Sequence, residues 1–538
     1  MNNNEQVNEE KKHVVVVVLG DIGRSPRMQY HTLSLLEHGH SVTLIGYAGE
    51  HLIPDLEQPI GGGYYFYRKN LHVIRMEPQL PSRNNLLDRL LYYPLRLKSL
   101  MGCLIHTLWV DLCNVIVTAP VDVVLVQNPP SVPTLLLVYL YCLSEWLWMW
   151  RKRPRLVIDW HNLGYTMFES PTQQTPLLRR IILTSIRTIA KTYERILAPR
   201  ADAHLTVTHA MEVWLGEHFN VHNNGARNNN VRVLYDKPPM LFRPTTMEEQ
   251  HELMMRLDLE GKHEQLRGWL NQNDDDDDDV HGEQTPIEQT LFTQCSIHNG
   301  ERIIQPRENR PALLISSTSW TPDEDFSVLL EALEKLHTSI IRNASKSAAA
   351  EASTSSFPNI LVVVTGKGPQ KEYYLPLLQK FNEQHQHIKI ITLWLEAEDY
   401  PKLLGCATLG VCLHTSTSGL DLPMKVLDMF GCQVPVCAIG FDCLDELVKD
   451  GVNGRVFRDG DELSQQLFDL LKGYPGESVE LERYRENIRG MTRWRENWDE
   501  CARHLIVGDW NNSFSDPIFG PILAVLLAVI MSIFVCSD

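Results

Sequence analysis

The chain alternates short apolar runs with amphipathic segments along most of its length, which predicts strands that alternate with helices. The first apolar run, Val14–Leu19, is rich in β-branched residues, as expected for a strand buried on both faces of a sheet. A helical pattern follows at 28–36, with Ser25 as its N-cap and Pro26 in its first turn, and 41–47 reads as the next strand. This order predicts a βαβ unit that binds ligands at the carboxyl ends of its strands.

Further apolar runs extend this pattern into two successive halves. In the first half, strands are predicted at 121–127, 155–160, 204–207 and 231–234, with a helix at 193–204. In the second half, strands are predicted at 312–316, 360–365, 388–393, 409–413 and 434–438, and helices at 326–336, at 400–404 and from Pro423 onward. No short internal repeat is present, so we predict an α/β chain with one domain at 13–240 and a second at 311–510.

Residues 132–150 form a strongly apolar run that contains Trp146, Trp148 and Trp150 and is followed by a basic stretch. The run is long enough to be considered as a membrane span. A span would put the strand predicted at 155–160 on the wrong side of the bilayer. We therefore expect a helix that packs on the sheet or enters the membrane interface, with a plain buried helix as the alternative.

Three segments fall outside the two predicted domains. Residues 1–12 are polar, lack the apolar region of a signal peptide and are expected to be disordered. Residues 241–310 lose periodicity and carry the acidic run 274–279, so we expect a linker enlarged by a disordered acidic insertion. Residues 517–535 are apolar and uncharged, which predicts a C-terminal transmembrane helix, with a buried terminal helix as the alternative.

Composition narrows the function classes. Lys+Arg 50 against Asp+Glu 67 gives a net charge of −17, which argues against general nucleic-acid binding. The 11 cysteines are scattered, without a CxxC pair or a Cys/His cluster of metal-ligand spacing. They fit free or buried thiols in a reducing compartment better than a disulfide framework, and no metal site is predicted.

The stretch 412–431 carries the clearest indication of ligand chemistry. A predicted strand ends there, a loop of small residues that includes Ser418 and Gly419 follows, and a helix begins. Free amides and the helix dipole at such a junction attract an anion. Lys425 adds a positive charge, and Asp428, one turn later, suits hydrogen bonds from sugar hydroxyls. An ordinary strand-to-helix crossover is the alternative.

Two more loops of the second half follow predicted strands. Gly366, Lys367 and Gly368 come directly after one strand, where the glycines let the backbone approach a ligand closely and the lysine can meet a phosphate. Ser319 belongs to the polar loop after another strand.

In the first half, Asp21, Gly23, Arg24 and Arg27 follow the first strand. The loop lacks GxGxxG, so a dinucleotide cofactor is not favoured there. The two arginines suit an anionic ligand, with solvated arginines as the alternative.

A second polar cluster, which includes Asp159 and His161, leaves the strand at 155–160. His161 suits a base or a hydrogen-bond donor to a sugar. A structural histidine is the alternative.

Six segments within 13–505 carry a resemblance to a known family. In chain order they are VVVVVLGDIGRSPRMQYHTLSLL, VLVQNPPSVPTLLL, LVIDWHNLGY, SSTSWTPDEDFSVLLEAL, VTGKGP and TSTSGLDLPMKVLDMFGC. On these segments the chain resembles the chitobiosyldiphosphodolichol β-mannosyltransferases of the dolichol pathway. The resemblance implies a GT-B glycosyltransferase, with two Rossmann-like domains facing a cleft. The lack of an N-terminal hydrophobic anchor and the acidic insertion depart from the family pattern, and both concern membrane attachment rather than chemistry.

The resemblance implies transfer of mannose from GDP-mannose to the 4-hydroxyl of the distal GlcNAc of a lipid-linked chitobiose. The second domain would hold the donor. Lys367, Lys425 and the amides around Ser418 and Gly419 would neutralise the departing diphosphate, and Asp428 would contact the ribose or the guanosine. Two glutamates seven residues apart bind the donor in many GT-B enzymes. Asp428 matches the second, and the first falls on Leu420 with Asp421 beside it. The remaining donor-side residues are Ser319, Gly366 and Gly368.

The first domain would face the acceptor, with Gly23, Arg24 and Arg27 at its diphosphate. An α-linked donor that gives a β product implies a single in-line displacement with inversion, which needs a base on the acceptor hydroxyl. The candidates for that base are, in this order, His161, Asp21 and Asp159.

By the same resemblance no metal is obligatory, because lysines and dipoles can do its work, while a Mg²⁺ dependence stays open. The expected partners are GDP-mannose, the lipid-linked chitobiose, the endoplasmic reticulum membrane and other mannosyltransferases of the dolichol pathway, with no nucleic acid. The catalytic domains are expected on the cytosolic face. The alternatives are a GT-B enzyme with another donor, such as UDP-GlcNAc, and a catalytically inactive GT-B scaffold subunit.

Overall fold

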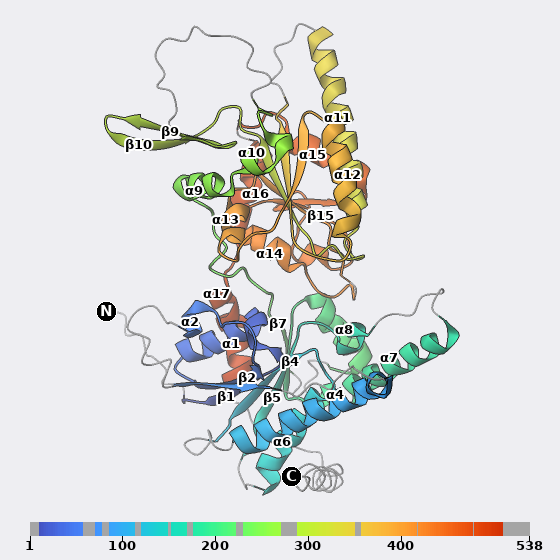
Figure 1. Ribbon diagram of the computed structural model, residues 1–538. Helices are drawn as coiled ribbons and strands as arrows, with labels where there is room; N and C mark the ends of the chain where they lie inside the picture. Colours follow the sequence, from blue (N-terminus) through green and yellow to red (C-terminus); the bar gives the residue numbers. More distant parts are fainter. Residues whose placement is uncertain are drawn as a thin grey trace. The chain divides into compact units, whose positions relative to one another are not determined.

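The structure, a computed structural model, describes most of the chain as two compact units, each built around its own parallel sheet (Figure 1). The first unit comprises the residues up to Tyr235 and those from Arg495 onward, and the second comprises Asp236–Trp494. The α/β class with two parallel-sheet domains is therefore confirmed. The described residues are 10–57, 70–77, 86–112, 120–148, 152–168, 176–221, 230–270, 288–349, 357–416, 418–476 and 478–508.

The first unit contains a seven-stranded sheet in the order β3-β2-β1-β4-β5-β6-β7, in which neighbouring strands are parallel. The strands are β1 His13–Asp21, β2 Ser41–Tyr47, β3 Leu71–Met76, β4 Val123–Asn128, β5 Arg155–Trp160, β6 Ala203–Thr206 and β7 Asn230–Val233. The apolar runs thus predicted six of them. β3 was missed because it is an edge strand with a largely exposed, mixed sequence.

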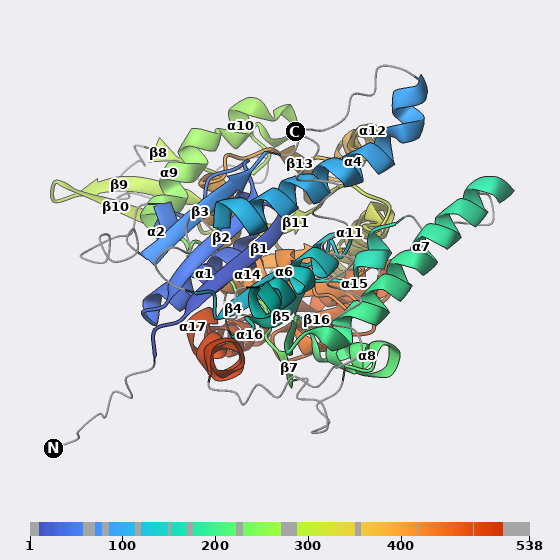
Figure 2. The ribbon, with the colours of Figure 1, turned by 90° about the horizontal axis from the view of Figure 1, so that it is seen from below.

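Helices cover both faces of this sheet (Figures 1 and 2). They are α1 Pro26–Glu37, α2 Pro54–Glu57, α4 Leu86–His106, α6 Thr134–Trp148, α7 Leu177–Leu197 and α8 His209–Phe219. α1 has Pro26 in its first turn as predicted, but Ser25 does not cap it with its side chain. The Ser25 hydroxyl instead donates to Gln127 Oε1 at 2.5 Å, which ties the start of α1 to β4.

The described part of the apolar run at 132–150 is mostly one helix of this unit. It forms α6, which packs on β4 and β5 and is covered in turn by α4. Most of its side chains up to Glu145 are buried, whereas Trp146 is exposed. The prediction of a helix packed on the sheet is confirmed. Within the described ranges we find no helix that combines the length and the apolar character needed to span a bilayer.

The last described segment returns to the first unit. It consists of α17 Trp494–Trp498 and α18 His504–Val507, joined by a short π-helix. The Arg155 guanidinium donates to the carbonyl of Leu505 at 2.9 Å, and Lys12 Nζ donates to that of Val507 at 2.6 Å. The second unit thus ends before the predicted bound of 510, because α18 packs against β4 of the first sheet. The anchor predicted at 517–535 lies outside the described residues.

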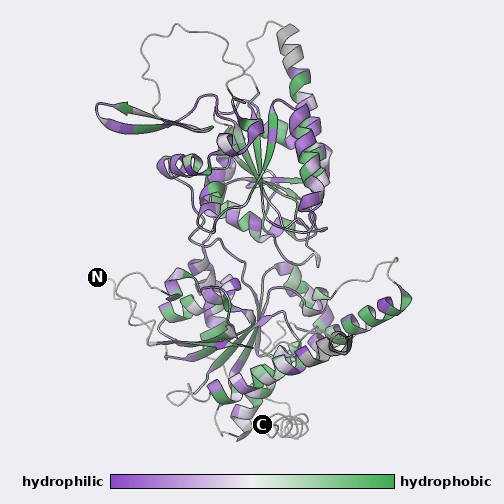
Figure 3. Ribbon diagram, viewed as in Figure 1, coloured by the Kyte–Doolittle hydropathy of each residue, from purple (hydrophilic) through white to green (hydrophobic). Residues whose placement is uncertain are grey.

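The second unit contains a six-stranded parallel sheet in the order β13-β12-β11-β14-β15-β16, the strand order of doubly wound folds. The strands are β11 Ala312–Ser317, β12 Ile360–Thr365, β13 Ile388–Leu393, β14 Leu409–Cys412, β15 Val436–Ile439 and β16 Gly454–Phe457. Leu313 and Ile315 of β11 face one core, and Ala312 and Leu314 face the other. Because both faces are covered, these strands read as continuous hydrophobic runs (Figure 3).

Two helical layers enclose this sheet. The helices are α11 Phe326–Ala349, α12 Lys371–Gln384, α13 Asp399–Gly405, α14 Met424–Gly431, α15 Gly460–Leu471 and α16 Val479–Arg489. α11, α12 and α15 contribute to one core, and α13 and α14 to the other. α11 runs well beyond the predicted helix at 326–336. The prediction stopped early because the sequence after Leu336 is mostly polar or small, although Ile340 still packs in the core.

The predicted linker at 241–310 is partly folded. It contains α9 Met247–Leu257, α10 Leu259–Lys262 and an antiparallel sheet of β8 Glu288–Gln289, β9 Thr293–His298 and β10 Glu301–Pro306. A capping box between Thr246 and Glu249 starts α9, which buries Leu253 and Met254 in a core of the second unit. The sequence predicted a linker here, and α9 was missed, because its few apolar residues are interspersed with charged, exposed ones. The acidic run 274–279 lies outside the described residues.

Candidate active site

A buried carboxylate lies at the carboxyl end of β5 and collects hydrogen bonds from three side chains. Nε and one terminal nitrogen of Arg27 each donate to Asp159 at 2.8 Å, in a two-pronged ion pair. Nε2 of His161 lies 2.9 Å from Asp159 Oδ2, and Nε2 of His31 lies 3.2 Å from the same oxygen. β5 places Asp159 and His161, whereas α1 supplies Arg27 and His31. Residues far apart in sequence therefore form one cluster, which we call the Asp159 cluster.

The charges of the Asp159 cluster balance internally. Burial alone would raise the pKa of Asp159, but the Arg27 guanidinium and the His161 ring outweigh burial and hold that pKa well below its usual range. Burial lowers the pKa of His31, which favours its neutral form. Trp498 Nε1 donates to His31 Nδ1 at 2.9 Å, so the proton of His31 sits on Nε2 and points at Asp159.

His161 is the member of this cluster that a substrate can reach. Its side chain is 23% exposed, whereas that of Asp159 is fully buried. When Nε2 of a neutral His161 donates to Asp159, its lone pair lies on Nδ1, which can accept a proton from a hydroxyl group. Asp159, a predicted candidate for the base, instead holds the ring and fixes its tautomer. Among the three predicted candidates for the base, the geometry favours His161.

The loop after β1 is stabilised by its own side chains. Asp21 accepts the backbone N–H groups of Gly23 and Glu50, both at 3.0 Å, so its carboxylate serves as a turn cap rather than as an exposed base. A Cβ on Gly23 would lie 2.5 Å from the carbonyl oxygen of Glu50, so close packing explains this glycine. Arg24 is 72% exposed and pairs with Glu50 at 2.9 Å.

The structure contradicts the prediction that Arg27 binds a diphosphate. Its side chain is 5% exposed, and two of its nitrogens bond Asp159. A third nitrogen donates to the carbonyl of Leu234 at 2.8 Å. Of the two arginines proposed for an anion, only Arg24 offers its guanidinium to solvent.

In the second unit, a buried glutamate that the sequence reasoning missed organises the loop after β11. The Glu324 side chain is 2% exposed and accepts hydrogen bonds from the Ser319 amide and the Thr318 hydroxyl, both at 2.5 Å. Lys425 pairs with Glu324 and donates to the Ser319 hydroxyl at 3.2 Å. The predicted residues Ser319 and Lys425 thus meet. Two carboxylates after the loop, Asp323 and Glu324, were the available indication in the sequence.

The glycines after β12 keep two loops close together. A Cβ on Gly366, whose φ is +129°, would lie 1.8 Å from the Thr318 carbonyl oxygen, and one on Gly368 would lie 1.7 Å from that of Ser319. Both glycines therefore allow two backbone segments to approach closely, and the predicted approach to a ligand stays a prediction. Lys367, between them, lies 3.6 Å above the ring centre of Trp394 in a cation–π contact.

The loop before α14 satisfies its own polar groups. The amide of Gly419, at φ +71°, donates to the Ser416 hydroxyl at 2.9 Å, and the amide of Leu420 donates to the Ser418 hydroxyl at 3.2 Å. The hydroxyl of Ser418 donates to Asp421 Oδ1 at 2.9 Å. Two of the amides near the predicted diphosphate position, those of Gly419 and Leu420, therefore bond serine hydroxyls in this structure, and Asp421 stabilises the turn.

Asp428 lies on α14 in a desolvated position. Burial raises its pKa to about 7, so near neutral pH the carboxyl group is partly protonated and can donate as well as accept a hydrogen bond. The neighbouring Tyr400 hydroxyl bonds Ser317 at 2.9 Å, and the pKa of Tyr400 is raised by burial and by Asp428. Both properties suit a carboxyl group that meets sugar hydroxyls rather than a cation.

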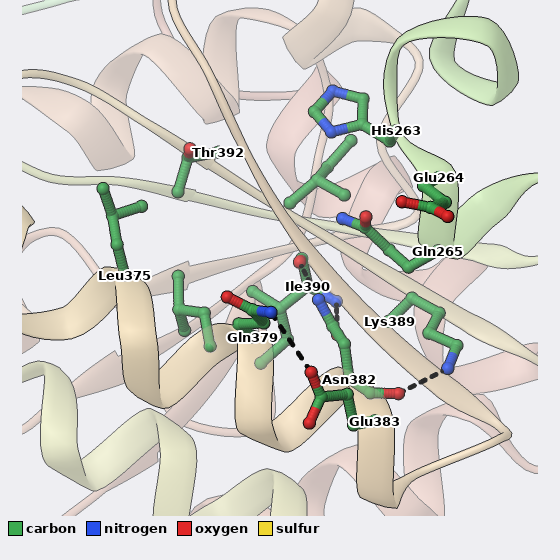
Figure 4. A pocket seen from close by; sticks show the side chains of 12 residues that line it. His263, Glu264, Gln265, Leu375, Gln379, Asn382, Glu383, Lys389, Ile390 and Thr392 are labelled. Atoms are coloured by element: carbon green, nitrogen blue, oxygen red, sulfur yellow. Dashed lines mark hydrogen bonds between the residues drawn. The ribbon is translucent and has the colours of Figure 1, made fainter.

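A surface pocket of about 600 Å³ lies elsewhere in the second unit, between α12, β13 and the segment 263–265 (Figure 4). Several of its polar groups pair with one another. Gln379 donates to Glu383 at 3.2 Å, and Lys389 Nζ donates to the carbonyl of Asn382 at 2.6 Å. None of the predicted site residues lines this pocket.

Among the described residues, His251, Glu288 and Cys295 are close enough to hold a metal ion, with ligand atoms within 4.8 Å of one another. Nε of Arg302 donates to Cys295 Sγ at 3.1 Å, and its terminal nitrogen pairs with Glu288. A guanidinium therefore already occupies the position that a cation would take, so the cluster fits a structural ion pair.

The sequence of this chain is similar to those of known glycosyltransferases. The family described as glycosyl transferases group 1 matches residues 311–473. The chain is 40% identical over 506 residues to the UDP-glycosyltransferase TURAN of Arabidopsis thaliana, which covers 91% of this chain and 96% of that protein. It is 38% identical over 503 residues to a chitobiosyldiphosphodolichol beta-mannosyltransferase of Pongo abelii, covering 92% of this chain and 93% of the relative.

A solved structure shares the fold. The glycosyltransferase from Rickettsia africae ESF-5 matches with a TM-score of 0.51 and 13% identity, covering 98% of this chain and 100% of that chain. At that identity the likeness concerns the fold alone.

Proposed function

The chain belongs to the family of the chitobiosyldiphosphodolichol β-mannosyltransferases, and from this premise we propose that it transfers mannose from GDP-mannose to chitobiosyl-diphosphodolichol. Membership makes it a glycosyltransferase. The observation that carries the proposal is a similarity that runs through both units rather than through one motif. The product would be the β-linked mannose on the lipid-linked chitobiose.

His161 is the proposed general base. Inversion in one displacement requires that the acceptor hydroxyl loses its proton as it attacks the sugar carbon on the face opposite the departing GDP. The proton would move to Nδ1 of His161, and the ionised Asp159 at Nε2 would stabilise the imidazolium that forms. The ion pair with Arg27 keeps Asp159 charged for this task, which supports the assignment.

The donor would bind at the loops around Glu324. Negative charge builds up on the diphosphate as GDP departs, and Lys367 and Lys425 would compensate it. Lys425 would exchange part of its contact with Glu324 for the phosphate. Asp428 would contact the ribose or the guanosine. We propose that no metal is obligatory, so activity should persist in EDTA, and a loss restored by Mg²⁺ would show the contrary.

A second candidate differs in the donor. One relative is named a UDP-glycosyltransferase, which favours testing uridine nucleotides as well. The full chain is incubated with a short-chain lipid-diphosphate chitobiose and with GDP-mannose or UDP-GlcNAc in turn, and the product mass is measured. A product one hexose heavier from GDP-mannose alone supports the proposal. Transfer from UDP-GlcNAc would overturn it, and no transfer from any donor would favour an inactive scaffold.

Because the proposed acceptor is linked to a lipid, the enzyme has to act at a membrane surface. We propose the cytosolic face of the endoplasmic reticulum, alongside other mannosyltransferases of the dolichol pathway, with residues 517–535 as a transmembrane anchor. Removal of 516–538 should then release the protein from carbonate-washed membranes and leave activity on a detergent-soluble acceptor. On the cytosolic side the sequons at Asn343 and Asn511 stay unmodified, so a glycan on Asn343 would overturn this topology.

A further inference from the structure

α7 is a long amphipathic helix whose apolar stripe faces solvent. Leu178, Ile182, Ile189 and Ile196, at spacings of four and seven residues, share one face and are 71%, 48%, 68% and 51% exposed. The amino-terminal half of the helix, up to Ile189, contains no buried side chain. Figures 2 and 3 show α7 extending beyond the sheet, with hydrophobic residues along its length. Soluble proteins rarely leave such a stripe uncovered.

The charges on α7 have the opposite sign to those of the chain. The chain as a whole carries a net charge of −17. α7 carries five basic residues and a single acid, Glu194, whose side chain is buried. The solvent-facing charges of the helix are therefore all positive, and they are Arg179, Arg180, Arg187, Lys191 and Arg195. An apolar face combined with such basic residues is the composition of a helix that lies in the interface of an anionic membrane.

The exposed apolar surface continues into the segment before α7. Met167 is 65% exposed and Phe168 is 37% exposed, and Arg187 donates to the carbonyl of Phe168 at 2.7 Å. The Arg187 guanidinium and Lys191 Nζ lie over the Tyr165 ring at 5.6 and 5.4 Å. This segment and α7 thus form one surface.

α7 is fixed to the loop that follows His161. Glu194 Oε1 accepts the Gly164 amide at 2.7 Å and the Asn128 side-chain amide at 3.1 Å, and Oε2 accepts the Tyr165 amide at 3.3 Å. These bonds join the carboxyl ends of β4 and β5 to the buried side of α7. A partner that binds α7 therefore also fixes the distance between that partner and His161.

We propose that α7, together with Met167 and Phe168, is a membrane-docking surface that seats its apolar face at the boundary of headgroups and acyl chains of an anionic phospholipid bilayer. The basic residues of the helix meet the lipid phosphates. The membrane role proposed for this surface rests on the proposed function, because a lipid-linked acceptor presents its sugar at that boundary. The docking brings the His161 loop to the sugar and does not depend on a transmembrane anchor.

A lipid-borne photolabel tests the docking without an activity readout. The full chain is reconstituted into vesicles of phosphatidylcholine and phosphatidylserine, at about two to one, that carry a diazirine on the acyl chain close to the glycerol. After irradiation the labelled peptides are mapped. Peptides from 177–189 and Met167–Phe168 should be labelled, and less so in pure phosphatidylcholine. Absence of label there overturns the proposal. A cross-link from α7 to a second copy of the chain or to residues 517–535 would also overturn the proposal, because protein rather than lipid would then cover the apolar face of the helix.

A matched pair of variants tests the consequence for the reaction. Ile182→Glu with Ile189→Glu places two acids on the apolar face, and Thr184→Glu with Thr188→Glu places two acids on the other exposed side of the same helix. The first pair should lower transfer to vesicle-embedded acceptor about tenfold and leave transfer to a detergent-soluble acceptor within about twofold. The second pair should change both within about twofold. Equal losses in the two pairs, or a loss in detergent as well, would overturn the proposal. Inactivity of the unmodified chain in detergent would instead count against the proposed function.

Discussion

The Asp159 cluster and the loops around Glu324 both lie where parallel strands end, yet they handle charge differently. In the first, a buried arginine and a buried carboxylate saturate each other, and a single edge, His161, reaches solvent. In the second, the ion pair is buried at one end, because Glu324 is buried and its partner Lys425 is partly exposed. Lys367 is held only on the face of an exposed tryptophan in the contacts we describe.

This difference separates a preset site from an adjustable one. A buried ion pair costs several kcal/mol to break, so Asp159 and Arg27 keep one geometry throughout a reaction. An exposed cation–π contact contributes only about 1 kcal/mol, so Lys367 can move to an arriving phosphate at little cost. Lys425 is partly exposed, so it can share its charge between the buried Glu324 and a phosphate. Orientation of a base needs the first kind of cluster, and binding and release of a nucleotide need the second.

The sharpest way to break the comparison is to remove charge from the buried pair. Asp159→Asn keeps the shape and leaves the Arg27 guanidinium buried without a counter-charge. We expect a loss of about 3–5 kcal/mol of unfolding free energy, measured by urea denaturation, together with loss of transfer. The double replacement Arg27→Met with Asp159→Leu removes both charges and should recover most of the stability but none of the activity. Stability unchanged in Asp159→Asn would show that the pair is not buried as described.

The second prediction separates the exposed edge of this cluster from its interior. His161→Ala removes the proposed base but leaves the Arg27–Asp159 pair in place. The expected effect is a fall in kcat of about 10²–10⁴-fold with little change in KM or melting temperature. His209, an exposed histidine of the same unit, provides the control, because His209→Ala should leave kcat unchanged. Turnover near the wild-type rate in His161→Ala would move the base elsewhere.

The third prediction distinguishes the two lysines of the second unit. Each change to Ala should lower kcat/KM about 10²-fold, because each removes positive charge from the departing diphosphate. Only Lys425→Ala should also lower the melting temperature, since it leaves Glu324 buried without its cation. Glu324→Gln combined with Lys425→Met should restore stability without restoring activity. Near-normal turnover in both single variants would exclude these lysines from the site.

The sequence revealed positions but not partners. Apolar runs located the strands of the two parallel sheets except β3 and β16, because a strand buried on both faces needs uninterrupted hydrophobic residues. They did not locate the strands of the small antiparallel sheet. Polar residues directly after β5 identified His161. The bond from Arg27 to Asp159 joins residues 132 positions apart, and no local pattern indicates that such charges meet. Arg27 was therefore assigned to a ligand. Glu324 was missed for the same reason, since burial of a carboxylate in a polar loop depends on Lys425, a hundred residues away.

The last and smallest effect concerns the pH dependence of stability at Asp428. An unfolded aspartate has a pKa near 3.9, whereas burial raises the pKa of Asp428 to about 7 in the folded protein. Between these values the folded state keeps a proton that the unfolded state has released, so stability falls as the pH rises through this window. Above about pH 7 the full cost of a buried charge is present and no further change is expected.

Asp428→Asn removes this ionisable carboxyl group and leaves every other charged side chain in place. Relative to wild type, the melting temperature of the variant should rise as the pH is raised from about 4 to 7 and then level off, with a gain of roughly 2–4 °C at pH 8. The neighbouring Tyr400 stays protonated over this range, because the pKa of its hydroxyl is raised and not lowered, so it adds no slope of its own. A gap that is constant with pH would mean that Asp428 ionises in the folded state as freely as in the unfolded chain. That result would place it with the adjustable, solvated groups, and would remove the argument that a partly protonated carboxyl group receives the sugar hydroxyls of the donor.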